Sequence, residues 1–96
     1  MNLVLRPAAA SDLEEAFLWY ESQRTGLGEE FLVAVTRVLE VLAESPLQYP
    51  TVHRQTRRAL VRRFPYSVLY RVVGSDVVVV GCFHGSRDPR RWRNRS

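Results

Sequence analysis

The sequence predicts a single α+β domain over residues 1–96: an N-terminal strand, an antiparallel helical hairpin, a three-stranded antiparallel meander and a short basic C-terminal segment. Three observations support this order, β-α-α-β-β-β. Apolar residues recur with helical spacing in the first half of the chain. Short β-rich runs fill the second half, and turn residues separate all the segments. The hairpin is therefore expected to pack on one face of a small, mainly antiparallel sheet.

In the first half, residues 2–6 read as a short strand that Pro7 ends, because proline has no amide donor. Ser11, followed closely by acidic residues, predicts the start of the first helix, and residues 25–28 (TGLG) predict its end. The second helix is expected to begin near Gly28 and to end at Ser45-Pro46. The first helix should bury the side formed by Leu13, Ala16, Phe17 and Tyr20. The second helix should bury the side formed by Phe31, Val35, Val38 and Leu42.

The second half predicts a polar loop and three strands. Residues 48–55 contain Pro50 and read as a loop that crosses to the sheet. Residues 57–63, 67–73 and 77–83 read as strands, and the last two should pair as a hairpin through Gly74-Ser75-Asp76. The run Val77–Val80 is apolar on both sides, as a strand covered on both faces requires.

Charge is divided unevenly along the chain. Residues 1–53 carry three arginines and eight acids, whereas residues 54–96 carry eleven arginines and two acids, for net charges of −5 and +9. The cationic half coincides with the predicted sheet, so its arginines are expected on a folded surface. This pattern favours an anionic partner.

The composition excludes several classes of protein. Cys82 is the lone cysteine and has no clustered histidines or cysteines around it, so we expect neither a disulfide nor a metal site, and no cofactor. The longest apolar run is too short to span a bilayer, and the N-terminus lacks a signal sequence. We therefore expect a cytoplasmic protein that does not associate with membranes.

Two stretches carry a resemblance to a known family. Residues 63–70 (RFPYSVLY) and 84–89 (HGSRDP), followed by Trp92, resemble the ParE branch of the RelE/ParE superfamily of bacterial toxins, and the likeness covers essentially the whole chain. The resemblance implies a toxin of a type II toxin–antitoxin system, neutralised by a cognate ParD-like antitoxin. ParE-like members are described as inhibiting DNA gyrase without being enzymes, whereas RelE-like members cleave messenger RNA on the ribosome without a metal.

The residues favour the first activity over the second. RelE-like nucleases place an arginine where this sequence has Ser67, and a second basic residue where it has Leu60. Trp92 stands nearest to their C-terminal tyrosine, and an indole cannot exchange a proton. We expect no catalytic residues; the alternative ribonuclease would use His84, Arg58 and Arg87. A degenerate toxin that retains only antitoxin binding is a third alternative.

Two contact surfaces are expected. The C-terminal segment would meet the target, gyrase, through arginines that surround an indole: Arg87, Arg90, Arg91, Trp92 and Arg93. The antitoxin would cover apolar residues of the first helix and cations of the sheet: Trp19, Leu18, Arg58, Arg62 and Arg71. Direct binding of nucleic acid is the less favoured explanation of the basic half, since strand aromatics usually pack against a core or a partner.

Overall fold

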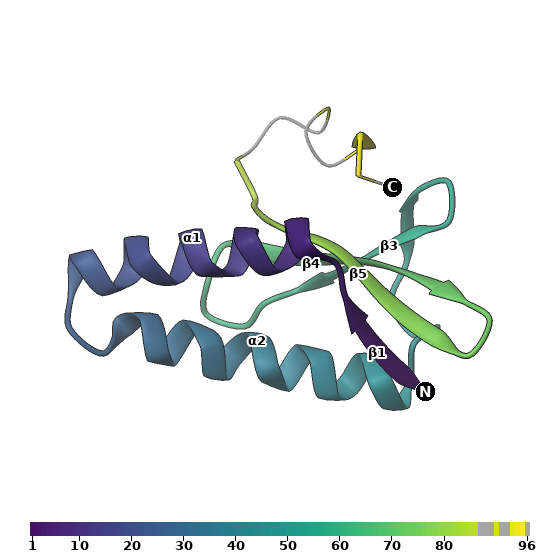
Figure 1. Ribbon diagram of the computed structural model, residues 1–96, viewed down its shortest axis with the longest axis horizontal. Helices are drawn as coiled ribbons and strands as arrows, with labels where there is room; N and C mark the ends of the chain where they lie inside the picture. The colour runs from purple at the N-terminus through teal and green to yellow at the C-terminus, as the bar shows by residue number, and fades with distance from the viewer. Residues whose placement is uncertain (87–89, 91–92, 96) are drawn as a thin grey trace.

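A computed structural model describes residues 1–86, 90 and 93–95 of the chain (Figure 1). The expected order of elements is confirmed, with one strand added. The elements are β1 (Asn2–Leu5), α1 (Pro7–Gln23), α2 (Leu27–Glu44), β2 (Thr51–His53), β3 (Thr56–Leu60), β4 (Tyr66–Val73) and β5 (Asp76–His84).

The strands form one sheet in the order β1-β5-β4-β3-β2. Strands β2 to β5 follow one another as an antiparallel meander, whereas β1 pairs with β5 in parallel, with Leu3 beside Val77 and Leu5 beside Val79. The helical hairpin supplies the long connection that separates β1 from the meander, and both helices pack on the same face of the sheet (Figure 1). The sheet therefore has a helix face and an opposite, open face.

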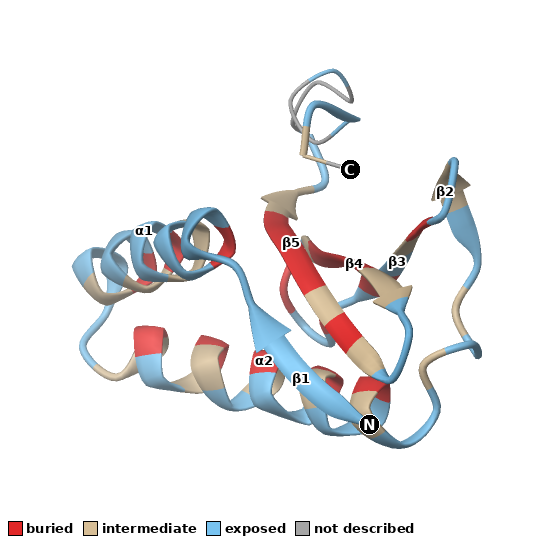
Figure 2. Cartoon of the chain, turned by 45° about the vertical axis from the view of Figure 1, so that its right-hand side comes forward, coloured by how far each residue is buried: buried red, intermediate tan, exposed pale blue. Residues whose placement is uncertain are grey.

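The core lies between the helices and the helix face, as the burial colours show (Figure 2). All four residues expected to form the buried side of α2 are buried, and of the four expected on α1, Ala16 and Tyr20 are buried and Leu13 and Phe17 half-buried. Tyr20 lies at the centre of an aromatic cluster, 5.2 Å from Phe31, 5.0 Å from Phe64 and 6.0 Å from Tyr66 between ring centroids. The rings of Phe64 and Tyr66 meet Tyr20 edge-to-face and that of Phe31 is tilted, and such ring contacts stabilise the core beyond the burial of apolar area.

A β-bulge in β5 decides which side chains reach this core. The register of β4 with β5 shifts between Leu69, which pairs with Gly81, and Tyr70, which pairs with Val79, so Val80 is an extra residue. Strict alternation would put Cys82 on the same side as Val78. Because of the bulge, Cys82 instead belongs to the core cluster together with Val77 and Val79, and Val80 does not. Alternation alone would therefore place Cys82 on the side of Val80, and the bulge instead puts Cys82 and His84 together on the helix face.

Helix α1 begins earlier than expected. It starts at Pro7 instead of Ser11, because the fixed φ of proline suits the first helical position, where no amide partner is needed. Ser11 and Asp12 consequently lie inside the helix, and Asp12 is free to contact another element. The turn into α2 has Gly26 at φ 91°, and the Glu21 carboxylate accepts hydrogen bonds from the amides of Gly26 and Gly28 at 2.9–3.1 Å.

The expected loop at residues 48–55 contains a strand. The short β2 pairs with β3, and the Arg58 amide donates to the Pro50 carbonyl at 3.2 Å. The Arg57 guanidinium also binds the carbonyls of Leu47 and Tyr49, which fixes the chain that leads into β2. An edge strand of three residues, with a single apolar residue and no buried position, gives no strand pattern in the sequence, so the prediction of a loop was wrong.

The strands of the meander end slightly differently from the prediction. Strand β3 stops at Leu60, because Arg63 adopts a left-handed conformation at φ 72° and turns the chain toward β4. The hairpin between β4 and β5 forms as expected, with Gly74 at φ 60° in its turn. Within the described part of the chain, neither helix has the length and apolar character needed to cross a membrane.

Replacement of Leu42 by Ala should lower the free energy of unfolding by about 2–5 kcal/mol, because the leucine is fully buried and its loss leaves a cavity. Urea denaturation measures the change. The matched control is Leu47→Ala, which truncates the same side chain where it is 66% exposed and should cost less than about 0.5 kcal/mol. Equal effects of the two substitutions would contradict the position of the core.

Candidate functional site

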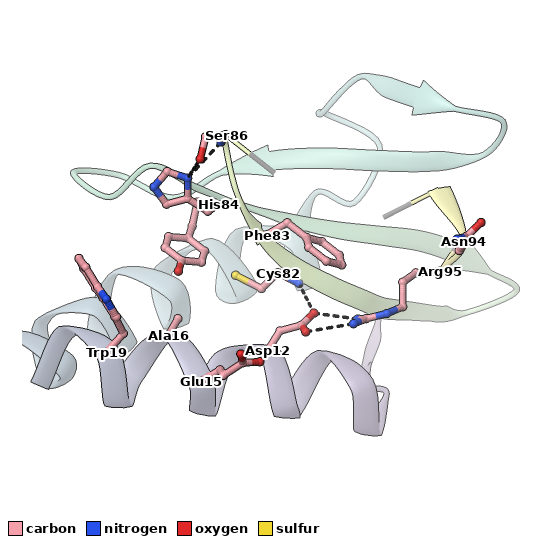
Figure 3. A pocket seen from close by; sticks show the side chains of 11 residues that line it. Asp12, Glu15, Ala16, Trp19, Cys82, Phe83, His84, Ser86, Asn94 and Arg95 are labelled. Carbon is pink, nitrogen blue, oxygen red and sulfur yellow. Dashed lines mark hydrogen bonds and ion pairs between the residues drawn. The ribbon is translucent and has the colours of Figure 1, made fainter. Parts of the chain in front are cut away.

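A hollow lies between α1 and the last residues of β5 (Figure 3). It has a volume of about 760 Å³. Ala16 and Cys82 line its inner part, Glu15 and Trp19 contribute from α1, and His84 lies above it at the end of β5. Tyr66 also lines it. The opposite wall is formed by Asn94 and Arg95 near the end of the chain, so residues from both ends of the sequence meet here.

An ion pair closes one side of this hollow. The Arg95 guanidinium donates to both carboxylate oxygens of Asp12, with Nη1 to Oδ2 at 2.8 Å and Nη2 to Oδ1 at 3.1 Å. The Asp12 side chain is 12% exposed and that of Arg95 30%. The paired carboxylate raises the pKa of Arg95, chiefly through these hydrogen bonds. The two residues are 83 positions apart, and no local pattern in the sequence indicates that they meet.

His84 is held by its own turn. Its Nδ1 accepts a hydrogen bond from the Ser86 amide at 3.0 Å and lies 2.7 Å from the Ser86 hydroxyl, and its ring meets that of Tyr66 edge-on at 5.3 Å. Acceptance at Nδ1 places a proton on Nε2 of the neutral ring. These contacts explain a histidine at this position without a catalytic task.

The structure does not bring together the residues of the alternative ribonuclease. Arg58 pairs with Leu69, and His84 pairs with Tyr66, three positions earlier on β4. Paired residues of neighbouring strands share a face, and an odd separation along a strand reverses it, so Arg58 lies on the open face and His84 on the helix face. Arg87, the third residue of that set, lies outside the described residues. His84 as a general base and Arg58 as a stabilising cation therefore could not act on the same phosphate.

The open face carries the positions at which RelE-like nucleases are expected to be basic. Leu60 pairs with Ser67 and Ser67 with Phe83, so all three lie on this face. Ser67 is buried, and Leu60 is largely exposed. Arg58 and Arg71 flank buried Leu69 on the same face, and Arg71 contacts the Gln55 side chain at 3.4 Å. This face presents guanidinium groups beside apolar residues, in an arrangement suited to contact with an anionic partner.

The residues expected to contact an antitoxin lie in three places. Leu18 and Trp19 are each 57% exposed on α1, and the Trp19 ring rests edge-on against Tyr20 at 5.0 Å. Arg58 and Arg71 lie on the open face of the sheet. Arg62 belongs to neither group, because it borders a second hollow between α2 and the outer edge of β3. One helical segment on α1 would therefore not reach all five residues.

The second hollow, which we call the α2–β3 groove, was not predicted from the sequence. It has a volume of about 560 Å³ and is lined by Glu30, Val33, Ala34, Arg37, Val38, Val41, Tyr49, Leu60, Arg62 and Arg63. Arg63 pairs with Glu30 at 3.2 Å, whereas Arg37 and Arg62 form no ion pair with another described residue. The signal was present in Val33 and Val41, which lie off the buried side of α2 and leave apolar groups exposed.

The residues expected to contact the target are only partly described. Arg90 and Arg93 are exposed, and Arg87, Arg91 and Trp92 lie outside the described residues. Arg95, which follows them, is engaged with Asp12. In the described part of the chain, no group of three or more histidine, cysteine, aspartate or glutamate side chains is placed to hold a metal ion.

Burial raises the pKa of the Cys82 thiol to about 12, and the negative charge of Asp12 adds to this effect. Cysteine reacts as the thiolate, so native Cys82 should be alkylated by iodoacetamide at pH 8 more than about a thousandfold more slowly than a thiol with a pKa near 8.5. Mass spectrometry of native and guanidinium-unfolded protein measures the two rates. Comparable rates would contradict the packing of Cys82 as a core residue.

Comparisons with known proteins agree with this geometry. Residues 3–89 match the family model described as the ParE toxin of the type II toxin–antitoxin system parDE. The fold is similar to that of a solved structure of the chromosomal ParDE system from P. aeruginosa, with a TM-score of 0.79 and 19% identity over 88% of this chain and 95% of the other. It is also similar to a chain of the RelBE2 toxin–antitoxin complex from Mycobacterium tuberculosis, with a TM-score of 0.64 and 24% identity over 86% and 95%. A search of curated proteins found no significant match.

Proposed function

Because this chain belongs to the family of ParE toxins of type II toxin–antitoxin systems, we propose that it inhibits DNA gyrase by binding it in the cytoplasm and that a cognate ParD-like antitoxin neutralises it. The observation that carries the proposal is the family match, which extends over residues 3–89 and includes both helices and the whole sheet. The chain has a net charge of +4, and residues 54–96 alone carry +9. This positive charge supports macromolecular partners with acidic surfaces.

The geometry supports inhibition by binding rather than by catalysis. Metal-free cleavage of RNA requires a base, an acid and cations around one phosphate. His84 and Arg58 lie on opposite faces of the sheet, and buried Ser67 occupies the position of a cation in RelE-like nucleases. Since the groups that would have to cooperate do not share a face, we assign no catalytic residue.

The C-terminal arginines are the proposed contacts with gyrase. Arg90 and Arg93 are exposed and belong to the same segment as Arg87, Arg91 and Trp92. Guanidinium groups bind carboxylates and phosphates in a bidentate manner, and an indole adds apolar area to such a contact. This segment is therefore suited to a protein surface or a protein–DNA complex with exposed negative charge.

The antitoxin is proposed to use the exposed apolar residues of α1 and, through a second segment, the α2–β3 groove. Trp19 and Leu18 offer the large side chains that commonly anchor an interface. The groove offers an apolar floor bordered by Arg37 and Arg62. An acidic, amphipathic chain that is long enough to contact both places would neutralise charge and cover apolar surface together.

A supercoiling assay with purified gyrase tests the proposed activity. The toxin should abolish the supercoiling of relaxed plasmid DNA and cause broken DNA to accumulate, and premixing it with the cognate antitoxin should restore supercoiling. Messenger RNA cut at codon positions in a translation reaction, with normal gyrase activity, would support the RelE-like alternative instead. Neither effect, together with tight antitoxin binding, would identify a degenerate toxin.

Trp19→Ala should weaken antitoxin binding by about 2 kcal/mol or more, because truncation removes a large anchor from the interface. Calorimetric titration with the antitoxin gives the affinity. Leu47→Ala is the control, since Leu47 is also an exposed apolar residue but lies in the connection between α2 and β2. A change of less than twofold in Kd for Trp19→Ala would remove α1 from the proposed interface.

A further inference from the structure

Strand β1 forms one edge of the sheet, and within the described residues it pairs only with β5. All of its residues are exposed, as Figure 2 shows, and Leu3, Val4 and Leu5 have exposed fractions of 39–42%. Proteins usually protect an edge strand with charged side chains, proline or a bulge, because its free backbone groups can pair with another strand. None of these three protections occurs within β1, whose sequence is NLVL.

The backbone groups of Leu3 and Leu5 point to this free edge. The amides of Asn2 and Arg6 donate hydrogen bonds toward the β5 side, at 3.2 and 3.1 Å. In a parallel pair, alternate residues of a strand bond to the same neighbour, so the residues between them face away from β5. Leu3 and Leu5 therefore each present an N–H and a C=O group to the outside.

The order of these groups is self-complementary. A second copy of β1 that runs antiparallel, with a two-fold axis at Val4, would place Leu3 opposite the partner's Leu5 and Leu5 opposite the partner's Leu3. Opposed residues whose backbone groups point at each other exchange two hydrogen bonds. Each of the two leucine pairs would do so, and Pro7, which has no amide donor, would end the pairing at this length.

The side chains of β1 also suit this pairing. Leu3 and Leu5 pair with Val77 and Val79 of the core, so they lie on the helix face of the sheet. In the two-fold arrangement they would cover the exposed parts of each other's side chains, which removes apolar area from water. Val4 lies on the open face, where it would contact the partner's Val4.

Charge complementarity favours a second copy of this chain over an unrelated strand. Asn2 pairs with Asp76 on the open face, and the partner's Arg6 would come opposite Asn2. Arg6 and Asp76 would then be separated by two strand spacings, about 10 Å between Cα atoms, which an arginine side chain can bridge. Within the described residues neither forms an ion pair, and the Arg6 side chain makes only a 3.5 Å hydrogen bond, to the Arg95 carbonyl. The new ion pair would form twice.

We propose that two copies of the toxin associate edge to edge through β1, so that their two sheets become one continuous sheet with a two-fold axis at Val4. This association goes beyond the proposed function and does not depend on gyrase. The interface is small because the paired strands are short, so the dimer should be weak and should form in a concentration-dependent manner. The α2–β3 groove borders β3, which two strands separate from β1, and it would stay accessible in the dimer.

Sedimentation equilibrium of the full chain without antitoxin, from about 1 to 200 µM, tests the association. The mass of wild-type protein should rise over this range from that of one chain to that of two. Leu3→Pro removes an outward N–H without removing a hydrogen bond to β5, and it should raise the dimer Kd about tenfold or more. The matched control is Leu3→Val, which keeps the N–H and should change the Kd by less than about threefold. Thermal unfolding followed by circular dichroism verifies that both variants are folded.

Charge reversal tests the predicted register without changing the backbone. Arg6→Glu and Asp76→Arg should each weaken the dimer several-fold, and the two together should recover at least part of the loss, because the ion pair is restored in reverse. Arg54→Glu is the control, since it reverses an exposed charge in the turn between β2 and β3, away from β1, and should leave the Kd within about twofold.

A single-chain mass at every concentration would overturn the inference, as would a Kd that Leu3→Pro leaves unchanged. It would also be overturned by a monomeric toxin whose affinity for antitoxin falls in Leu3→Pro and not in Leu3→Val. That result would assign the free edge of β1 to an extended segment of the antitoxin.

Discussion

The β-bulge at Val80 is the constraint on which the arrangement of the candidate site depends. Without it, alternation from Val78 would place Cys82 and His84 on the open face, beside Arg58 and Arg71. The extra residue reverses this order and turns both side chains toward the helices, where Cys82 is buried and His84 packs against Tyr66. One inserted residue therefore separates His84 from Arg58 and Arg71, and it does so through backbone geometry alone.

The same bulge shapes the edge of β5 that Arg95 contacts. Gly81 pairs with Leu69 immediately after the extra residue and leaves space on one side of β5 for Phe83 and Arg95. The Cys82 amide then faces Asp12, which helix α1 can present only because the helix begins at Pro7. A helix that began with Ser11 as its N-cap would have used the first-turn acids to bind its own amides. The early start of α1 and the bulge in β5 thus act together.

Much of the fold could be predicted from periodicity, because the buried sides of α2 and the apolar run of β5 are local patterns. The hairpin turn at Gly26 and the end of α2 at Ser45 were likewise marked by residues with strong conformational preferences. Strand β2 could not be predicted, since its three residues are placed by pairing with β3 and by Arg57, which binds the carbonyls of the preceding chain. The contact of Asp12 with Arg95 is purely tertiary, and a charged residue near a helix start was more simply explained as a cap.

The contacts of the arginines change the interpretation of the uneven charge distribution along the chain. Arg57 and Arg95 bind carbonyls or a carboxylate within the fold, and Arg63 pairs with Glu30 from the acidic half. Arg63 and Arg95 join parts of the chain that lie 33 and 83 positions apart, whereas Arg57 binds carbonyls only 8 and 10 positions earlier. The charge available to a partner is therefore smaller than the count in the second half indicates; among the described residues it includes Arg54, Arg58 and Arg62.

The hollow between α1 and β5 suggests how neutralisation and target binding are connected. Trp19, the proposed antitoxin anchor, and Arg95, which ends the proposed gyrase-binding segment, line the same hollow between α1 and β5. An antitoxin chain anchored on Trp19 would lie across this hollow, beside Arg95. It would then block gyrase by its bulk, and the ion pair between Asp12 and Arg95 would stay in place. Neutralisation would require no change in the fold of the toxin, because the two partners would compete for one side of a rigid molecule.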